Sequence, residues 1–399
     1  MKQDDTLESA AVAPIQDGID MWARADMEPR IRDILDRTIR DRAHGPYSAR
    51  TEAEVIAMLT RYFERTERLQ QIAVDDVSRM AGGASKEQFA FTLRHAGNPA
   101  GERLVLRMDP LEAIAQTCRG REAQVHRAFD GKLPVASVRS VDAEGDILGQ
   151  PAIILGFVSG VTEPTEGTGH GVSGIGTRYD HWADKLSPQF IDALATVHTF
   201  DLVGADLDLF AVPRAGTRQA ALWQVNWWSK VWWDGLVQPV AIMTYAERWL
   251  RENAPICEKP VMCHSDLRLG NFMFEEPSGK FTAVLDWELA HIGDFHEDIA
   301  WATQRLFGTW TDDGTFLVCG LIAREKFLAD YEARSGNRID PERLRYYEVL
   351  NAYKCGVIDL GQAMRASTEG NSHQDIVLTW LGSAGGVFLQ QLVTLMRED

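Results

Sequence analysis

Paired cysteines are missing from this chain. Its five cysteines are scattered, odd in number and never spaced as CxxC. Disulfide frameworks and structural zinc sites both depend on such pairs, so the sequence disfavours both. We therefore expect a protein of the reducing cytoplasm.

Export and membrane signals are missing as well. The opening MKQDDTLESAAVAPIQDG has neither a basic region nor an apolar core of the kind found in signal peptides, and no apolar run of 18 residues follows. These features predict a protein without a membrane segment. They are typical of a chain that is not exported.

Basic residues are fewer than acidic ones. Lys and Arg number 41 against 58 Asp and Glu, which gives a formal net charge of −17 over 399 residues. Because a nucleic-acid surface needs clustered Lys and Arg, the balance argues against nucleic-acid binding. The length is sufficient for two or three compact units with substantial cores.

Three regions with different patterns follow one another along the chain. Residues 1–70 predict a helical extension, with apolar side chains at helical spacing that must pack on the main body or on a second subunit, as in a homodimer. Residues 71–158 predict short strands around one helix, and residues 159–399 predict a mainly helical region. The fold class expected from this order is α+β.

The most informative motif is CHSDLRLGNF at residues 263–272. Asp266 can orient or deprotonate a hydroxyl, and Asn271, five residues later, offers an amide oxygen that suits Mg²⁺. The following NFMFEEPSGKFTAVLDWE reads as strand, turn and strand, so a hairpin would return Asp286 to Asn271. Because Mg²⁺ is usually bound by few protein groups plus phosphate oxygens, this set indicates a nucleotide site.

The segments HSDLRLGNFMF and AVLDWELAHIGD, with LATVHTFD upstream, resemble the aminoglycoside phosphotransferase family. Within that family they are similar to the kinase-like domains fused to some acyl-CoA dehydrogenases. The resemblance implies a protein-kinase-like, two-lobed fold. It has a small mixed or antiparallel sheet with one helix in the first lobe and a larger, mainly helical second lobe.

The resemblance also implies an activity and residue roles. The enzyme would transfer the γ-phosphoryl group of ATP or GTP to a hydroxyl of a small molecule. Asp266 would be the catalytic base, with Asn271 and Asp286 as the Mg²⁺ ligands. His264 and Arg268 would support the catalytic loop, although Arg268 is equally compatible with a phosphate contact or a solvated side chain.

The first lobe contains candidate nucleotide-binding residues. Gly82, Gly83 and Ser85 fit a turn whose backbone N–H groups approach phosphates, with a plain hairpin turn as the alternative. Arg107 stands where kinases usually carry a phosphate-binding lysine, and Glu122 is the expected partner acid. An ordinary surface ion pair is the alternative for these two residues.

Base recognition is expected at the end of the strand AIILGFVSG. In this fold an adenine edge would hydrogen-bond to backbone groups of Gly156, Phe157 and Val158. Backbone recognition does not depend on side-chain identity, so ATP and GTP remain equally open as donors.

The acceptor is less defined by the sequence. The segment LWQVNWWSKVWWDGL places several tryptophans on one helical face, which suits core packing or an acceptor pocket. The family-derived options are an aminoglycoside or amino-sugar, a choline-like alcohol and a hydroxyacyl-CoA thioester.

Three other functions compete with small-molecule phosphorylation. One is a catalytically silent nucleotide-binding module, which Arg107 in the lysine position allows. Another is a metal-dependent hydrolase built on His264, His291 and His296, although no HExxH spacing occurs. A protein kinase is disfavoured because LDWE is not followed by Phe-Gly and no APE segment is present.

Overall fold

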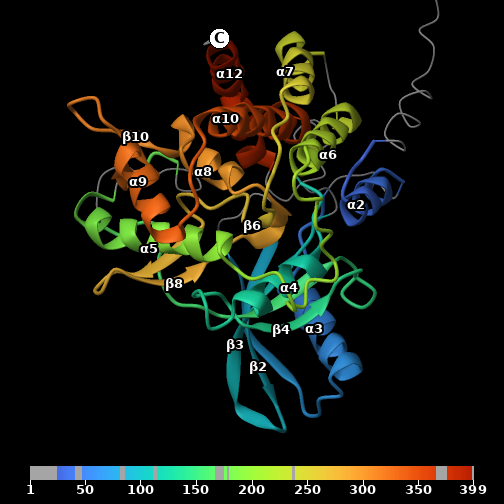
Figure 1. The fold of residues 1–399 in the computed structure, drawn as a ribbon. Coiled ribbons are helices and arrows are strands. Elements are labelled where there is room, and N and C mark those ends of the chain that lie inside the picture. Colours follow the sequence, from blue (N-terminus) through green and yellow to red (C-terminus); the bar gives the residue numbers. More distant parts are fainter. Residues whose placement is uncertain are drawn as a thin grey trace, which may run out of the picture.

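The structure is a computed structural model. It describes residues 25–40, 47–80, 86–110, 115–166, 175–177, 179–235, 239–364 and 375–397. Figure 1 shows a strand-rich lobe below and a helical lobe above.

The smaller lobe is built on a five-stranded sheet with the order β1-β2-β3-β5-β4, in which every neighbouring pair is antiparallel. Its strands are β1 (Ala73–Arg79), β2 (Glu87–His95), β3 (Asn98–Met108), β4 (Val138–Asp142) and β5 (Ala152–Gly156). Cross-strand pairs such as Phe91 with Leu104 bury one face of this sheet. The opposite face carries Arg107 towards α4 (Arg119–Phe129).

The buried face of the sheet is covered by α3 (Glu52–Thr66). This helix begins with a capping box, in which Thr51 and Glu54 satisfy each other's backbone N–H groups. Its Val55, Leu59 and Phe63 are fully buried in the same core as the sheet. The helical spacing of these apolar residues thus matches one packed face.

The helix α2 (Pro29–Arg40) packs on the other lobe. Ile31, Ile34 and Leu35 are buried in the core of the helical lobe, and α2 contacts α6 (Gln219–Gly235) there (Figure 1). The two N-terminal helices therefore join different lobes of the main body. The predicted homodimer contact of the extension stays a prediction.

The larger lobe is mainly helical. Besides α6 it contains α5 (Ala183–His198), α7 (Ala241–Glu252), α8 (His296–Ala302), α9 (Arg324–Ser335), α10 (Pro341–Gly356), the π-helical segment Val357–Ala363 and α12 (Asp375–Arg397). Short 3₁₀ turns lie at Asp180–Trp182, Trp287–Leu289 and Arg305–Phe307. Among the described residues, no helix combines the length and apolar character required to cross a bilayer.

Short strands in this lobe frame the CHSDLRLGNF motif. The strand β6 (Val261–Cys263) pairs with β9 (His291–Gly293), and β7 (Phe272–Glu275) pairs with β8 (Lys280–Val284), both antiparallel. A further antiparallel sheet contains β10 (Thr309–Trp310), β11 (Phe316–Val318) and β12 (Ile322–Ala323). The motif thus occupies the connection from β6 to β7.

The predicted α+β fold with two lobes is confirmed, and the small sheet is antiparallel throughout rather than mixed. The domain limits at residues 70 and 158 stay predictions. The chain leaves the sheet at Gly156, and Val161 then pairs with Phe274 of β7. The connection between the lobes is thereby fastened next to the motif.

Candidate active site

The loop between β6 and β7 is held by a buried carboxylate from α8. Asp298 accepts hydrogen bonds from the backbone N–H groups of His264 at 2.7 Å and Ser265 at 2.6 Å, and from His198 Nε2 at 3.0 Å. Burial alone would raise the pKa of Asp298, but these donors hold it at about 2. The loop is fixed with Ser265 in the left-handed region, at a φ of 66°.

His264 uses both ring nitrogens inside this loop. Its Nε2 donates to the Leu285 carbonyl at 2.9 Å, and its Nδ1 accepts from the Asp266 N–H at 3.2 Å. Burial lowers the pKa of His264, so the neutral form is favoured. With both nitrogens engaged, the ring is suited to bracing the loop and not to binding a metal.

The Asp266 carboxylate has a hydrogen-bond donor on each oxygen. Its Oδ1 accepts from Trp301 Nε1 at 2.9 Å and from Arg268 Nε at 3.1 Å, and its Oδ2 accepts from Asn271 Nδ2 at 2.7 Å. Arg268 also donates to the Leu269 carbonyl at 2.7 Å, so its guanidinium supports the loop from within. The carboxylate is held in one orientation and its side chain stays 15% exposed.

Asn271 lies beside Asp266, and the hairpin brings Asp286 to the same place. The Leu285 N–H donates to the Asn271 carbonyl at 2.8 Å, which fixes the end of β8 against the start of β7. The Asn271 amide nitrogen is committed to Asp266, so its Oδ1 is the atom oriented for a cation. Asp286 follows in the left-handed region, at a φ of 64°. Burial and the nearby Glu288 raise the pKa of Asp286 to about 6.

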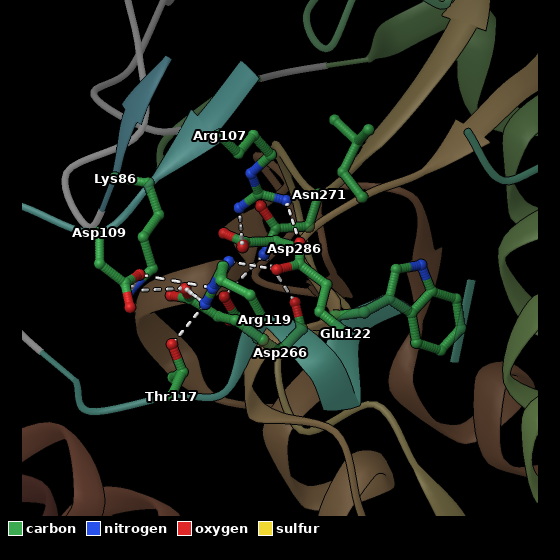
Figure 2. Close-up of polar contacts among 12 residues, drawn as sticks. Lys86, Arg107, Asp109, Thr117, Arg119, Glu122, Asp266, Asn271 and Asp286 are labelled. Carbon is green, nitrogen blue, oxygen red and sulfur yellow. Dashed lines mark hydrogen bonds and ion pairs between the residues drawn. The ribbon is translucent and has the colours of Figure 1, made fainter. Parts of the chain in front are cut away.

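Arg107 connects the two lobes at this point. Its Nη1 donates to Glu122 of α4 and its Nη2 donates to Asp286, each at 2.7 Å. Both contacts are drawn in Figure 2. The side chains of Arg107 and Glu122 are almost completely buried. Although burial opposes its charge, Glu122 and Asp286 raise the pKa of Arg107, so the guanidinium stays protonated. The pair is therefore a buried contact and not a surface ion pair.

A second group of buried charges surrounds this pair and was not identified from the sequence. Arg119 forms ion pairs with Glu122 and with Glu288 Oε2, the latter at 3.2 Å. Lys86 Nζ lies 3.1 Å from Asp109 Oδ1 and 3.2 Å from Glu288 Oε2. Figure 2 shows Lys86 just before β2, Asp109 just after β3 and Arg119 of α4 grouped near Arg107 and Asp286. Three basic and four acidic side chains thus form a network of buried ion pairs: Lys86, Arg107 and Arg119 with Asp109, Glu122, Asp286 and Glu288.

The sequence spacing of these charged residues indicates part of this arrangement. Arg119 stands three residues before Glu122, a spacing that places both side chains on one face of a helix. Glu288 stands two residues after Asp286, and Lys86 directly follows the glycine-rich segment. The burial of Lys86, Arg119 and Glu288, however, depends on how the start of β2, α4 and the 3₁₀ turn at Trp287–Leu289 pack together.

The remaining predicted nucleotide contacts are only partly described. Gly82, Gly83 and Ser85 lie outside the described residues. At the end of β5, the Gly156 N–H donates to the Ser137 carbonyl at 2.8 Å, and the Phe157 N–H donates to the Arg103 carbonyl at 3.1 Å. A nucleotide base at this edge would therefore bond to the backbone carbonyl groups of Gly156 and Phe157 or to the backbone of Val158.

The donor set fits Mg²⁺ and does not fit a closed metal site. Within the described ranges, no group of three or more His, Cys, Asp or Glu side chains is arranged to hold a metal ion. His291 faces Glu297 at 3.2 Å and His296 faces Asp294 at 2.6 Å, so each is tied to a neighbouring carboxylate. Asn271 and Asp286 would offer two oxygen ligands, the number typical where phosphates complete the shell of Mg²⁺. This arrangement argues against the metal-dependent hydrolase.

A two-lobed α+β fold, with a loop carboxylate facing a buried cation–carboxylate pair, defines a kinase-like phosphotransferase. The chain belongs to the phosphotransferase enzyme family, abbreviated APH, whose model matches residues 76–347. The resemblance drawn from the sequence is therefore confirmed, and so is the prediction of an enzyme of the small-molecule kinase class.

Curated relatives resemble this chain over part of their length. It is 25% identical over 219 residues to acyl-CoA dehydrogenase family member 10 of Mus musculus, and 26% identical over 202 residues to family member 11 of Rattus norvegicus. These regions make up 51% and 47% of this chain but only 18% and 25% of the two relatives. The chain thus corresponds to a quarter or less of each relative.

Two solved structures described as phosphotransferases have the same fold. One is a Ralstonia eutropha protein described as an aminoglycoside phosphotransferase, with a TM-score of 0.59, 20% identity, and coverage of 86% of this chain and 98% of that one. Another is an APH(2″) enzyme in complex with GDP and kanamycin, with a TM-score of 0.51, 16% identity, and coverage of 85% and 99%. At these identities the likeness establishes the kinase-like fold alone.

Proposed function

We propose that this protein is a Mg²⁺-dependent kinase that transfers the γ-phosphoryl group of ATP or GTP to a hydroxyl of a small molecule. The observation that carries the proposal is the placement of Asp266 and Asn271 on one fixed loop, opposite Asp286 and the buried Arg107. Family membership and a GDP complex among the structural neighbours support a nucleotide donor.

The reaction needs a base, a route for the leaving group and charge stabilisation. Asp266 accepts the proton of the acceptor hydroxyl while the hydroxyl oxygen bonds to the γ-phosphorus. The bond from the γ-phosphorus to the bridging oxygen breaks, and that oxygen leaves with the nucleoside diphosphate. Arg107, which faces Asp286, offers positive charge to the phosphates. Asn271 and Asp286 would hold Mg²⁺, which would neutralise phosphate charge.

The acceptor belongs to one of three chemical classes: an aminoglycoside or similar amino-sugar, a choline-like alcohol, or a hydroxyacyl-CoA thioester. Similarity to acyl-CoA dehydrogenase family members supports the third class, while structural likeness to an enzyme bound to kanamycin supports the first. The net charge of −17 favours cationic acceptors. The fold alone does not separate the three classes.

The test is a screen of these classes for acceptor-dependent release of ADP or GDP. Wild-type protein should release the diphosphate with at least one class, and the Asp266→Asn variant should not. Nucleotide binding without release for any acceptor would instead support the catalytically silent module. Absence of both binding and release would reject the kinase and the silent module together.

We also propose that the protein acts in the cytoplasm. The five cysteines are all free and buried. Free cysteines are typical of reducing compartments. Localisation of a tagged full-length chain in the source cell tests this point, and a secreted protein would contradict it.

A further inference from the structure

Lys354 of α10 lies beneath the catalytic loop with its ammonium group fully enclosed. Its Nζ donates to the Ser265 carbonyl at 2.8 Å and to the Ser265 hydroxyl at 2.7 Å. The residue is only 1% exposed. Because lysine is almost never fully buried without partners, these contacts and not packing alone explain its position.

Two indole rings complete the surroundings of this ammonium. Nζ lies 4.3 Å from the ring centroid of Trp301 and 5.2 Å from that of Trp228, both within the range of a cation–π interaction. Burial lowers the pKa of Lys354, whereas the nearby Glu297 and Asp266 carboxylates act in the opposite direction. The tryptophan-rich helix α6 thus contributes one ring of this enclosure.

The Trp301 indole connects this lysine to the proposed base. Its face lies on the Lys354 ammonium, and its Nε1 donates to Asp266 Oδ1 at 2.9 Å. A second connection runs through the backbone, because Ser265 directly precedes Asp266 and adopts a φ of 66°. Residues other than glycine adopt this left-handed backbone conformation only when the surrounding structure holds them in it.

We propose that Lys354 is a positioning residue for Asp266, acting through the Trp301 indole and the Ser265 backbone. The proposal rests on the proposed function, in which Asp266 takes the proton of the acceptor. Without the ammonium, Ser265 loses the donor to its carbonyl and the indole loses the charge on its face. Asp266 then occupies its productive orientation less often, although the nucleotide-binding residues are untouched.

The first test compares turnover with nucleotide affinity in Lys354→Met and Trp301→Phe. Each variant should lower kcat for nucleoside diphosphate release about tenfold to a hundredfold, the scale of a small misplacement of a reacting group. The nucleotide dissociation constant should stay unchanged. The loss in the double variant should be smaller than the two single losses combined, because both substitutions disturb the connection through the Trp301 indole. Wild-type kcat in both single variants, or fully additive losses, would overturn the proposal.

Tyr353→Phe is the matched control. It lies next to Lys354 on α10 and loses a buried hydrogen bond between its hydroxyl and Ser229, which are 3.3 Å apart. This variant should lower the melting temperature slightly and leave kcat unchanged. A kcat loss equal to that of Lys354→Met would mean that general damage to α10 explains the effect, which also overturns the proposal.

A second measurement does not depend on activity. The indole ¹⁵N–¹H resonance of Trp301 is assigned by its disappearance in Trp301→Phe, and Asp266→Asn should move it by changing the acceptor. Lys354→Met should also move this resonance, and Tyr353→Phe should not. A Trp301 resonance that is unmoved in Lys354→Met would overturn the positioning role. Absence of turnover in the wild type would instead contradict the proposed function, and the resonance would still test Lys354.

Discussion

Arg107 of the smaller lobe donates to Asp286 of the larger lobe over 2.7 Å while its other terminal nitrogen donates to Glu122 over the same distance. One guanidinium thus bridges the partner acid on α4 and the proposed metal ligand. A lysine has a single nitrogen and cannot reproduce this planar two-way contact. Arg107, in place of the usual lysine, therefore keeps the positive charge but changes the geometry of the contact.

Replacement of Arg107 should separate the effect of charge from the effect of shape. Arg107→Met should weaken ADP or GDP binding at least tenfold and destabilise the fold, because two carboxylates lose a buried partner. Arg107→Lys should keep part of the binding. Calorimetry with the diphosphate and with the nucleoside alone checks the role, since loss of a phosphate contact leaves nucleoside binding unchanged. Equal losses for both ligands would contradict it.

Asp266→Asn should remove the proton acceptor and keep the shape of the loop. We expect the transfer rate to fall by about 10²–10⁴-fold, the usual contribution of a general base. Nucleotide binding and melting temperature should change little. Asp184→Asn, the same change at an exposed position of α5, is the control and should keep full activity. Asp266→Asn with unchanged turnover would show that the base has been assigned wrongly.

Glu28 should stabilise the junction between the N-terminal segment and α4. Its Oε1 accepts from Arg121 Nη1 at 2.8 Å and from the Ala211 N–H at 3.1 Å, and the pair is buried. Glu28→Ala leaves a buried guanidinium without its carboxylate, so unfolding free energy should fall by about 3–5 kcal/mol.

The matched control for Glu28 is a more exposed ion pair of the same segment. Glu144 pairs with Arg30 and Arg37 of α2, and its side chain is 42% exposed. Glu144→Ala should cost about 0–1 kcal/mol, as exposed pairs do. Chemical denaturation compares the two variants, and equal costs would contradict the role assigned to burial.

Asp359 should make stability depend on pH. It is buried in the π-helical segment, and burial raises its pKa to about 8. The folded state therefore binds a proton that the unfolded state has released, and stability falls as pH rises from about 4 to about 8. Each pH unit costs at most about 1.4 kcal/mol.

Asp359→Asn removes this titration. The melting temperature of the variant should therefore rise relative to that of the wild type as pH increases from 5 to 8. Above about pH 8 the difference should become constant, because Asp359 is then ionised in both states. Thermal denaturation at several pH values measures the difference. A difference that is independent of pH would mean that Asp359 keeps an ordinary pKa in the folded protein.

The sequence predicted what depends on local spacing. Asp266 and Asn271 stand on one short loop, and the turn at residues 277–279 favours a hairpin, so the approach of Asp286 follows from residues that are close in the chain. Apolar periodicity likewise predicted α3, whose buried residues form a single stripe.

Contacts between distant elements could not be predicted in this way. Trp301 and Lys354 reach Asp266 and its neighbour Ser265 from α8 and α10, and no pattern near either residue marks it as different from core packing. The burial of Lys86 similarly depends on Asp109, just after β3, and on Glu288 in the turn after β8. Tertiary packing alone brings these residues together.

The most direct test of the central claim is calorimetric titration of the wild type with ADP and GDP, with and without Mg²⁺, beside Asp286→Ala. The wild type should bind at least one of the diphosphates more tightly with Mg²⁺, because Asp286 and Asn271 would hold the ion against the phosphates. Asp286→Ala should lose this Mg²⁺-dependent gain. No binding of either diphosphate, or an equal Mg²⁺ gain in both proteins, would contradict the proposed Mg²⁺–nucleotide site.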